Sequence, residues 1–319
     1  MTCSGAVICR AADFYEMEAF MNKKFIFEYA AEHKLCENAL QCILKNADII
    51  EKSGCEEEFD RAGRILFDSA AENPEEYIAA LDRISEKTGI EPHELYLLFY
   101  IHEAHNGKLL YEKNNIDEQI IRNTFEDIVY KMNECKTAGG YYGISRPRWF
   151  YGYFRATRFQ LGRMQFELSE VPAVCELCGL TLKKGAAAVR IHIPDNGKAF
   201  DEASRLDAYK KAYGFFAEKF AGRTIPFVCS SWLLSPVNEK FLGEKSNIVG
   251  FSREFKIIGT EQSSVSAVWI FGTDNCDDVS ALPEDNTLRK KYKQWLKNGN
   301  HILSAEGVFL FDGENIYNK

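Results

Sequence analysis

The chain has 319 residues, and 39 lysines and arginines against 47 aspartates and glutamates give it a formal net charge of −8. At roughly 150 residues per domain this length predicts two domains, and the hydrophobic (46%) and charged (27%) fractions exclude a wholly disordered chain. The acidic charge disfavours general binding to nucleic acid or an anionic membrane, and no apolar run approaches the roughly 20 residues of a membrane helix.

The cysteines are mostly scattered singly, which is typical of reduced thiols that pack as small hydrophobic side chains. Because no signal peptide is recognised at the N-terminus either, we expect a cytoplasmic protein. Cys175 and Cys178 form the one Cys-x-x-Cys pair, and no second pair or His-x₃₋₅-His follows it. A hairpin carrying two incidental thiols is favoured over a zinc or redox site, and no metal is predicted.

Residues 1–140 have helical periodicity and almost no strand signal, so we predict an all-α N-terminal domain. Asn73-Pro74 is a helix start signal and Thr88-Gly89 a stop signal. A second helix is expected from Glu91-Pro92 to Asn106-Gly107, and a third from Asp117 along the stripe Ile120, Thr124, Ile128 and Met132. Together these signals indicate a bundle of about five or six helices.

Residues 141–319 alternate between strand and helix patterns, so we predict an α/β domain there. Strand, helix and strand over 186–234 imply one parallel pair in an otherwise antiparallel mixed sheet. Strands are also expected at 255–258 and 265–271, a helix after Asn286-Thr287, and a last hairpin pairing 301–303 with 308–311. The fold class expected for the whole chain is α+β with two domains.

The first chemistry-bearing stretch ends the strand Val189–Ile193 and leads into a helix that we expect Asp201 to cap. Ligands of α/β sheets usually bind where a strand runs into a helix N-terminus. Pro194 lacks an N–H, so strand pairing is expected to stop there and leave backbone groups for a ligand. His192 stands at this edge and suits proton transfer near neutral pH; the alternative is an imidazole that only hydrogen-bonds a loop.

The second stretch, 227–234, follows the crossover helix. Alternation on a strand puts Cys229 and Ser231 on one face and Ser230 and Trp232 on the other. A thiol or hydroxyl from this strand near His192 would be a competent acyl acceptor, although a cysteine in an apolar strand is more often core.

Glu167 and a set of arginines complete the candidates. A carboxylate at Glu167 is placed to orient His192 or act as general base; the alternative is a surface residue paired with Arg163. Arginines alternate with aromatic residues over 146–163, a pattern that can form a single-strand nucleic-acid platform. The acidic net charge favours solvated arginines around buried rings instead.

Several strings in the second half resemble one family: LGRMQFE (161–167), RIHIPD (190–195), FVCSSWLLSP (227–236), SNIVGFSREFKII (246–258) and VWIFG (268–272). They are similar to the GNAT-like C-terminal domain of bacterial acyltransferase domain-containing proteins, which a helical N-acyltransferase N-terminal domain precedes. The resemblance implies transfer of an acyl group from acyl-CoA or acetyl-CoA to an amine. The partners it implies are a small-molecule amine or a peptide, with no nucleic acid and no membrane.

A GNAT fold holds the CoA pyrophosphate on a glycine-rich Arg/Gln-x-x-Gly-x-Gly/Ala loop at a helix N-terminus. This chain has Asn196-Gly197-Lys198 at that place, followed by the carboxylates of Asp201 and Glu202. We therefore expect CoA contacts from Ile193, Asn196, Gly197, Lys198 and Trp232.

Three hypotheses follow. In the first, an amine attacks a bound thioester directly, Glu167 or His192 takes the proton, and backbone N–H groups near 191–193 stabilise the oxyanion. In the second, acyl transfer passes through a Cys229 thioester, with Ser231 as a further candidate on the same face. In the third, the domain binds a ligand without catalysis.

Overall fold

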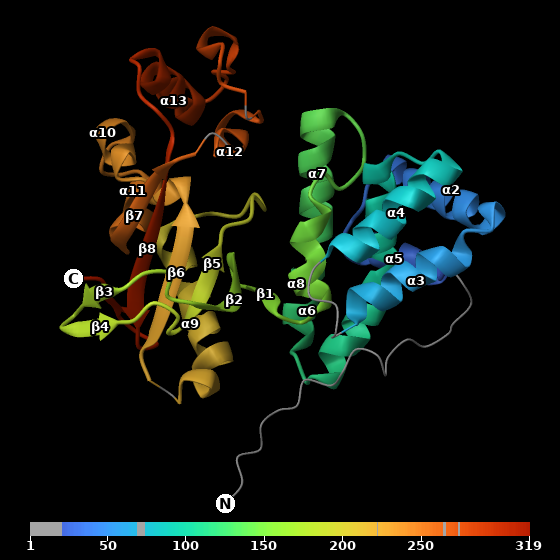
Figure 1. The fold of residues 1–319 in the computed structure, drawn as a ribbon, viewed down its shortest axis with the longest axis horizontal. Helices are drawn as coiled ribbons and strands as arrows, with labels where there is room; N and C mark the ends of the chain where they lie inside the picture. Colours follow the sequence, from blue (N-terminus) through green and yellow to red (C-terminus); the bar gives the residue numbers. More distant parts are fainter. Residues whose placement is uncertain (1–20, 69–73, 222, 264–265, 274) are drawn as a thin grey trace, which may run out of the picture. The chain divides into compact units, whose positions relative to one another are not determined.

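The computed structural model describes residues 21–68, 74–221, 223–263, 266–273 and 275–319 (Figure 1). The chain divides into two compact units, Met1–Gln160 and Leu161–Lys319. The sequence places the boundary after residue 140, but the segment that follows belongs to the helical unit because its aromatic rings pack there. Tyr100 in the long central helix contacts Phe150 and Phe154, with ring centroids 4.6 and 5.5 Å apart.

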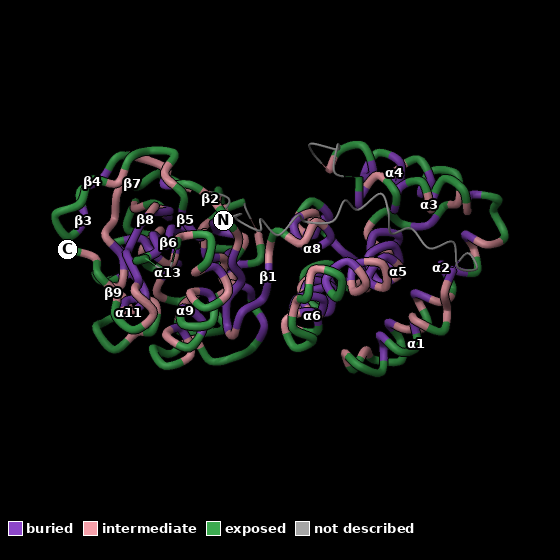
Figure 2. Tube along the Cα trace, turned by 90° about the horizontal axis from the view of Figure 1, so that it is seen from below, coloured by how far each residue is buried: buried purple, intermediate pink, exposed green. Residues whose placement is uncertain are grey.

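The N-terminal unit is helical, as predicted, and its largest group of buried residues lies in α5, where Figure 2 shows buried stretches of the chain. Its helices are α1 (Lys23–Glu32), α2 (Glu37–Ser53), α3 (Glu56–Phe67), α4 (Glu75–Thr88), α5 (Pro92–Lys113), α6 (Glu118–Phe125), α7 (Asp127–Gly139) and α8 (Tyr151–Phe154).

Several of these helices end where the sequence signals lie. Gly89 and Gly140 close α4 and α7 in the left-handed conformation, with φ of 70° and 79°. The Asp117 carboxylate caps α6 by accepting a hydrogen bond from the Gln119 N–H. Asn73, predicted to cap α4, lies outside the described residues.

Two helix predictions in this unit are wrong in detail. Asn106-Gly107 does not end a helix; it lies inside α5, where a β-carbon on Gly107 would stand 2.5 Å from Phe125 Cζ. Glycine is needed there for close packing and is not a stop signal. The stripe from Ile120 to Met132 is also divided between α6 and α7, which meet at Glu126.

The C-terminal unit is built on a mixed sheet in the order β1-β2-β5-β6-β8-β7, with β9 paired to β8. Among the pairs with a defined register only β5 and β6 run parallel, as the sequence predicts. Its strands are β1 (Arg158–Leu161), which begins at the end of the helical unit, β2 (Met164–Glu170), β3 (Cys175–Leu177), β4 (Leu180–Leu182), β5 (Ala187–His192), β6 (Ile225–Ser231), β7 (Lys256–Gln262), β8 (Leu303–Phe311) and β9 (Ile316–Tyr317). Its helices are α9 (Glu202–Phe216), α10 (Glu239–Leu242), α11 (Asn247–Arg253), α12 (Ala267–Phe271) and α13 (Thr287–Lys297).

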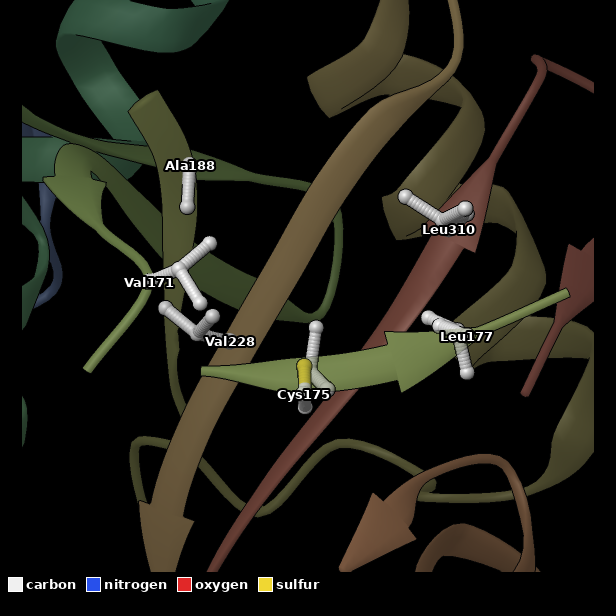
Figure 3. Close-up of a cluster of buried hydrophobic side chains, with 7 residues drawn as sticks. Val171, Cys175, Leu177, Ala188, Val228 and Leu310 are labelled. Atoms are coloured by element: carbon white, nitrogen blue, oxygen red, sulfur yellow. The ribbon is translucent and has the colours of Figure 1, made fainter. Parts of the chain in front are cut away.

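The two faces of this sheet are covered differently. On one, called the helix face, Tyr209 of α9 packs on Phe227 and Phe309, with ring centroids 6.0 and 5.0 Å apart. On the other, called the hairpin face, the β3–β4 hairpin crosses the sheet, and Cys175 and Leu177 pack over strands β6 and β8 (Figure 3). The other members of this apolar cluster are Val171, Ala188, Val228, Val308 and Leu310. The Cys175/Cys178 pair thus belongs to a hairpin.

Two strand predictions are wrong. Residues 267–271 form the helix α12, whose Ile270 and Phe271 pack into a core with Tyr292 of α13; a short apolar run does not distinguish a strand from a buried helix. The predicted hairpin at 301–311 is one continuous strand, β8. Gly307 lies in its middle because a β-carbon there would stand 2.9 Å from the Phe255 side chain, so this glycine marks a close approach.

Candidate functional site

Strands β5 and β6 part at their carboxyl ends. Their parallel register comprises Val189 with Phe227 and Arg190 with Val228, and no further pair is registered although both strands continue. Each strand stays paired on its outer side, β5 with β2 up to His192 and β6 with β8 up to Ser231. Beyond the Arg190–Val228 pair the inner edges of the two strands are thus not registered with each other. The sequence predicts that the two strands part here, and their register ends at Arg190, before Pro194 is reached.

His192 and Glu167 lie beside the opening and contact each other. Gln165 stands opposite His192 and Glu167 opposite Arg190, so Glu167 and His192 are diagonal neighbours on the hairpin face. His192 Nε2 lies 2.8 Å from Glu167 Oε1, and the two side chains are 19% and 20% exposed. A carboxylate only accepts hydrogen bonds, so Nε2 carries the proton and the lone pair of a neutral imidazole is at Nδ1. The pair has the arrangement of an oriented general base.

The register extends this pair into a row of polar side chains across the hairpin face. Arg190 is opposite Val228, Ser230 is opposite Glu306, and Glu261 is opposite Ser304. Alternation therefore puts the side chains of Ser230, Glu306, Ser304 and Glu261 on the same face as His192. The resulting polar row runs along the sheet edge next to the apolar cluster, and its members are Gln165, Glu167, Arg190, His192, Ser230, Glu261, Ser304 and Glu306.

Part of the polar row lines a cavity of about 300 Å³ over strands β6, β7 and β8. Its walls are Ser230, Gly259, Thr260, Glu261, Ser304, Ala305 and Glu306. A β-bulge in β7 shifts the register between Ile257 and Gly259, and Gly259 has no side chain to fill the space. This volume suits a small molecule or one polar group of a larger one.

The structure does not bring Cys229 to His192. Cys229 is opposite Gly307 and lies with Phe227 on the helix face, whereas His192 is on the hairpin face. Complete burial raises the pKa of its thiol to about 12, because the thiolate would lose its hydration. Ser231 is on the same face as Cys229, and its Oγ accepts a hydrogen bond from the Leu233 N–H. The β6 hydroxyl on the face of His192 is Ser230.

Trp232 is also away from the polar row. The strand ends at Ser231, and Trp232 begins a 3₁₀ turn, Trp232–Leu234, which takes its ring out of the sheet. The ring is 9% exposed and packs edge-on against Tyr292 at 5.7 Å. Trp232 is therefore part of a hydrophobic core in this structure.

The loop between β5 and α9 is held by its own hydrogen bonds. Arg163 Nη1 donates to the Pro194 carbonyl at 2.8 Å and Arg163 Nε to the Lys198 carbonyl at 3.1 Å. The Asn196 amide closes a turn by accepting from the Lys198 N–H, and Gly197 adopts a φ of 64°. Ile193, between His192 and Pro194, is half-buried.

The N-terminus of α9 is occupied by a side chain. The Asp201 carboxylate accepts a hydrogen bond from the Ser204 N–H at 2.8 Å. Hydrogen bonds from the backbone and the side chain of Ser204 lower the pKa of this carboxylate. An anion already occupies the favourable field of the helix end.

The other sequence candidates have structural partners. Arg148 pairs with Glu75, and the Arg158 guanidinium lies 4.3 Å from the Trp149 ring centroid, so these arginines do not form an open stacking platform. Among the described residues no group of three or more His, Cys, Asp or Glu side chains is arranged to hold a metal ion. No helix in the described ranges is long and apolar enough to cross a membrane.

Known families match the two units separately. Residues 28–156 match the N-acyltransferase N-terminal domain, and residues 158–309 match the GNAT-like C-terminal domain. The chain therefore has the two-domain architecture of an N-acyltransferase N-terminal domain followed by a GNAT-like C-terminal domain. No curated protein sequence matches it.

Solved structures of acyltransferases share this fold across both domains. One, an acyltransferase mutant in complex with octanoyl-CoA, aligns with a TM-score of 0.70 at 16% identity over 92% of this chain and 90% of that chain. Another, an acyltransferase in complex with decanoyl-CoA and teicoplanin, aligns with a TM-score of 0.59 at 16% identity over 89% of this chain and 98% of that chain. The two-domain fold inferred from the sequence strings is therefore confirmed.

Sequence reasoning selected Glu167 and His192, whose contact the structure shows, but did not include the far half of the polar row. The string RIHIPD contains Arg190, yet nothing in it says that Arg190 and His192 share a face with residues of β7 and β8. Ser230, Glu306 and Glu261 join the row only through the strand order β6-β8-β7 and its register. The alternation of side chains along the strand, which puts Ser230 and Cys229 on opposite faces, is the one sequence signal that could have pointed to Ser230.

Proposed function

We propose that this protein is an N-acyltransferase that moves an acyl group from acyl-CoA to the amine of a small molecule or peptide. The observation that carries the proposal is the opening between β5 and β6 with the His192–Glu167 pair at its edge. Structures of the same fold are complexes with octanoyl-CoA and decanoyl-CoA, which supports acyl-CoA as the donor. Because no disulfide joins the described cysteines, we further propose that the protein acts in the cytoplasm.

The donor would lie along the opening. Amide groups of its pantetheine arm would pair with the inner edges of β5 and β6 beyond Arg190 and Val228, as an added strand does. Asp201 already occupies the N-terminus of α9, so we assign the anionic end of CoA to the loop Ile193–Lys198, with the Lys198 ammonium as its cationic partner. Asn196 and Gly197 shape this loop. The packing of Trp232 in a core gives it no part in this arrangement.

The reaction we propose is direct attack. The amine nitrogen forms a C–N bond with the thioester carbonyl carbon, and backbone N–H groups near 191–193 stabilise the oxyanion. His192 Nδ1 accepts the proton from the nitrogen, and the resulting imidazolium is stabilised by the Glu167 carboxylate on Nε2. The C–S bond then breaks, and the imidazolium proton passes to the departing thiolate to give CoA.

The first prediction tests this pair. His192→Ala and Glu167→Gln should each lower kcat for acyl transfer from octanoyl-CoA to an amine by about 10²- to 10⁴-fold, because the base is lost or misoriented. Initial rates of CoA release measure the effect. Circular dichroism and the thermal shift caused by octanoyl-CoA should stay at wild-type values, since neither variant removes the opening. Wild-type rates in both variants would refute the mechanism.

A second candidate is a binding module without catalysis, which the Asp201 carboxylate at the α9 N-terminus favours. Such a module should show no binding heat with acetyl-CoA, propionyl-CoA or CoA in a calorimetric titration. Binding heat together with CoA release in the presence of an amine would eliminate it.

A further inference from the structure

The turn Gly162-Arg163 joins β1 to β2 and lies in the string LGRMQFE, of which the proposed chemistry uses only Glu167. Gly162 adopts a φ of 68°, and a β-carbon on it would stand 3.1 Å from Asp207 Oδ2 and 3.2 Å from Ala208 Cα. Both of these residues belong to α9, so the turn packs directly on that helix. Glycine is needed here for its left-handed backbone and for the close approach.

The packed turn places Arg163 beside the loop between β5 and α9. Arg163 is 9% exposed, and its guanidinium donates from Nη1 to the Pro194 carbonyl and from Nε to the Lys198 carbonyl. The Arg163 carbonyl accepts a hydrogen bond from Asn196 Nδ2 at 3.4 Å, and the guanidinium lies 5.4 Å from the Phe200 ring centroid. One buried arginine thus joins the start of the loop to its later residues through a single planar fork.

The two guanidinium hydrogen bonds set the direction of peptide groups in the loop. The C=O and the N–H of a trans peptide point in opposite directions. Because the carbonyls of Pro194 and Lys198 point to the guanidinium, the N–H groups of the same two peptides, those of Asp195 and Ala199, point away from it. Asp195 and Ala199 are exposed, so this side of the loop is accessible to a ligand.

The loop has little charge of its own with which to bind an anion. Lys198 is the one cation in residues 193–201, and the exposed Asp195 and the capping Asp201 carry the opposite charge. A single exposed ammonium is weakened by water and salt. Binding must therefore depend on backbone donors that are oriented before the ligand arrives, because ordering a loop during binding costs affinity.

We infer that Arg163 is a positioning residue for the acyl donor. It holds the loop in the conformation that binds the anionic end of CoA, and it acts through the Pro194 and Lys198 carbonyls, without contacting the phosphates itself. The inference rests on the proposed acyl transfer and adds to it a residue that determines donor affinity.

The experiment compares two donors that differ in the anionic end, octanoyl-CoA and octanoyl-pantetheine, which lacks the phosphates and the nucleotide. Isothermal titration calorimetry of the full chain gives the Kd of each. Arg163→Lys keeps the charge without the planar fork, and Arg163→Met keeps only the apolar stem. Each should weaken octanoyl-CoA binding by about tenfold or more and leave octanoyl-pantetheine binding within about twofold of the wild type. Arg223→Met, at an exposed position before β6, should change neither Kd.

A second pair of variants moves the turn without changing any charge. Gly162→Ala places a β-carbon against α9 and should displace Arg163, so it should also weaken octanoyl-CoA binding and spare octanoyl-pantetheine. Gly185→Ala is the matched control in the turn between β4 and β5. Gly185 has a φ of 82°, and a β-carbon there would meet only Glu170 Oε2, at 3.7 Å. This variant carries the same backbone strain and should bind both donors as the wild type does.

The outcomes separate the inference from the proposed function. Wild-type affinity of Arg163→Lys for octanoyl-CoA would overturn the inference, because the charge alone would then suffice. Equal weakening of both donors would also overturn it, because Arg163 would then support the fold in general. In either case the proposed function is still decided by the rates of the His192 and Glu167 variants. A wild-type protein that binds neither donor would contradict the proposed acyl-CoA donor and the inference with it.

Discussion

Neighbouring residues in β6 differ in chemistry because the strand alternates. Cys229 is buried under the aromatic rings of the helix face, and Ser230 is exposed on the face that carries His192. The thiol is the stronger nucleophile as a free residue, but burial raises its pKa to about 12, and the exposed hydroxyl is the group on the face that carries the base. Position in the pleat outweighs intrinsic reactivity here.

The second prediction follows from that burial. Cys229→Ala should keep near-wild-type transfer rates, because a thiol held protonated inside a core forms no thioester. Incubation with octanoyl-CoA should add no mass to the protein in intact-mass spectrometry. Loss of activity, together with a stable octanoyl adduct that the variant lacks, would instead support the covalent route.

The third prediction concerns His102 in α5. Its ring packs against Phe59 at 5.6 Å, and its Nδ1 is buried with no hydrogen-bond partner among the described residues. Burial lowers the pKa of His102 to about 4 from 6.5. Below pH 6.5 the unfolded chain therefore binds a proton that the folded chain does not, and the free energy of unfolding should fall by about 3 kcal/mol between pH 6.5 and 4.

Urea unfolding across this pH range measures the effect of His102. The His102→Leu variant should show a flatter pH dependence, whereas His301→Leu, at an exposed position, should keep the wild-type slope. A slope for His102→Leu equal to that of the wild type would mean that the imidazole already binds its proton in the folded state, for example with Glu103, whose Oε1 lies 4.0 Å from Nε2.

At the scale of the element, the same residue type has different roles. Gly107 and Gly214 both lie inside helices, α5 and α9. A β-carbon at Gly107 would be 2.5 Å from Phe125 and 3.3 Å from Phe154, whereas one at Gly214 would meet nothing within 4 Å. The first glycine permits helix packing, and the second only costs conformational entropy.

The fourth prediction uses this matched pair. Gly107→Ala should destabilise the protein by about 1–2 kcal/mol, since the clash with buried rings exceeds the gain in helix propensity. Gly214→Ala should stabilise it by about 0.5–1 kcal/mol, because only the propensity changes. Denaturant unfolding of the two variants gives the two signs. A stabilised Gly107→Ala would show that the Phe125 ring moves aside at little cost.

The sequence predicts elements well where a local signal acts and less well where tertiary packing decides. Gly89, Gly140 and Asp117 terminate helices through their own backbone or side-chain chemistry, and all three were predictable. Gly307 and Asn106-Gly107 look like turn signals. The two glycines are instead needed because aromatic rings from distant parts of the chain pack closely against them. The run 267–271 is too short to show whether its apolar residues follow a helix or a strand period. The core into which it packs decides its structure.

The same division applies to the site. His192 and Glu167 were predictable because a proline and a strand end are local features, and their contact needs only adjacent strands. Ser230, Glu306 and Glu261 come together through a strand order that reverses β7 and β8, which no local pattern encodes. The missing half of the site is the half that depends on topology.

At the scale of the whole molecule, all the residues proposed for the donor and for catalysis belong to the C-terminal unit, Leu161–Lys319. The donor is assigned to the opening between β5 and β6 with the 193–198 loop, and none of these loop residues lines the cavity over β6, β7 and β8. Donor binding should therefore stabilise the fold whether or not the charges of that cavity are intact.

The last prediction measures this linkage and the acyl chain together. At about 100 times its Kd, octanoyl-CoA should add about 2.7 kcal/mol to the stability of the unit that binds it, a rise of about 5–10 °C in Tm by differential scanning calorimetry. Because each buried methylene contributes up to about 0.8 kcal/mol, octanoyl-CoA should raise Tm further than acetyl-CoA at equal concentration. Glu261→Gln and Glu306→Gln should leave both shifts intact. Equal shifts for octanoyl-CoA, acetyl-CoA and free CoA would mean that the protein does not bury the acyl chain, and that the donor is recognised by its CoA part alone.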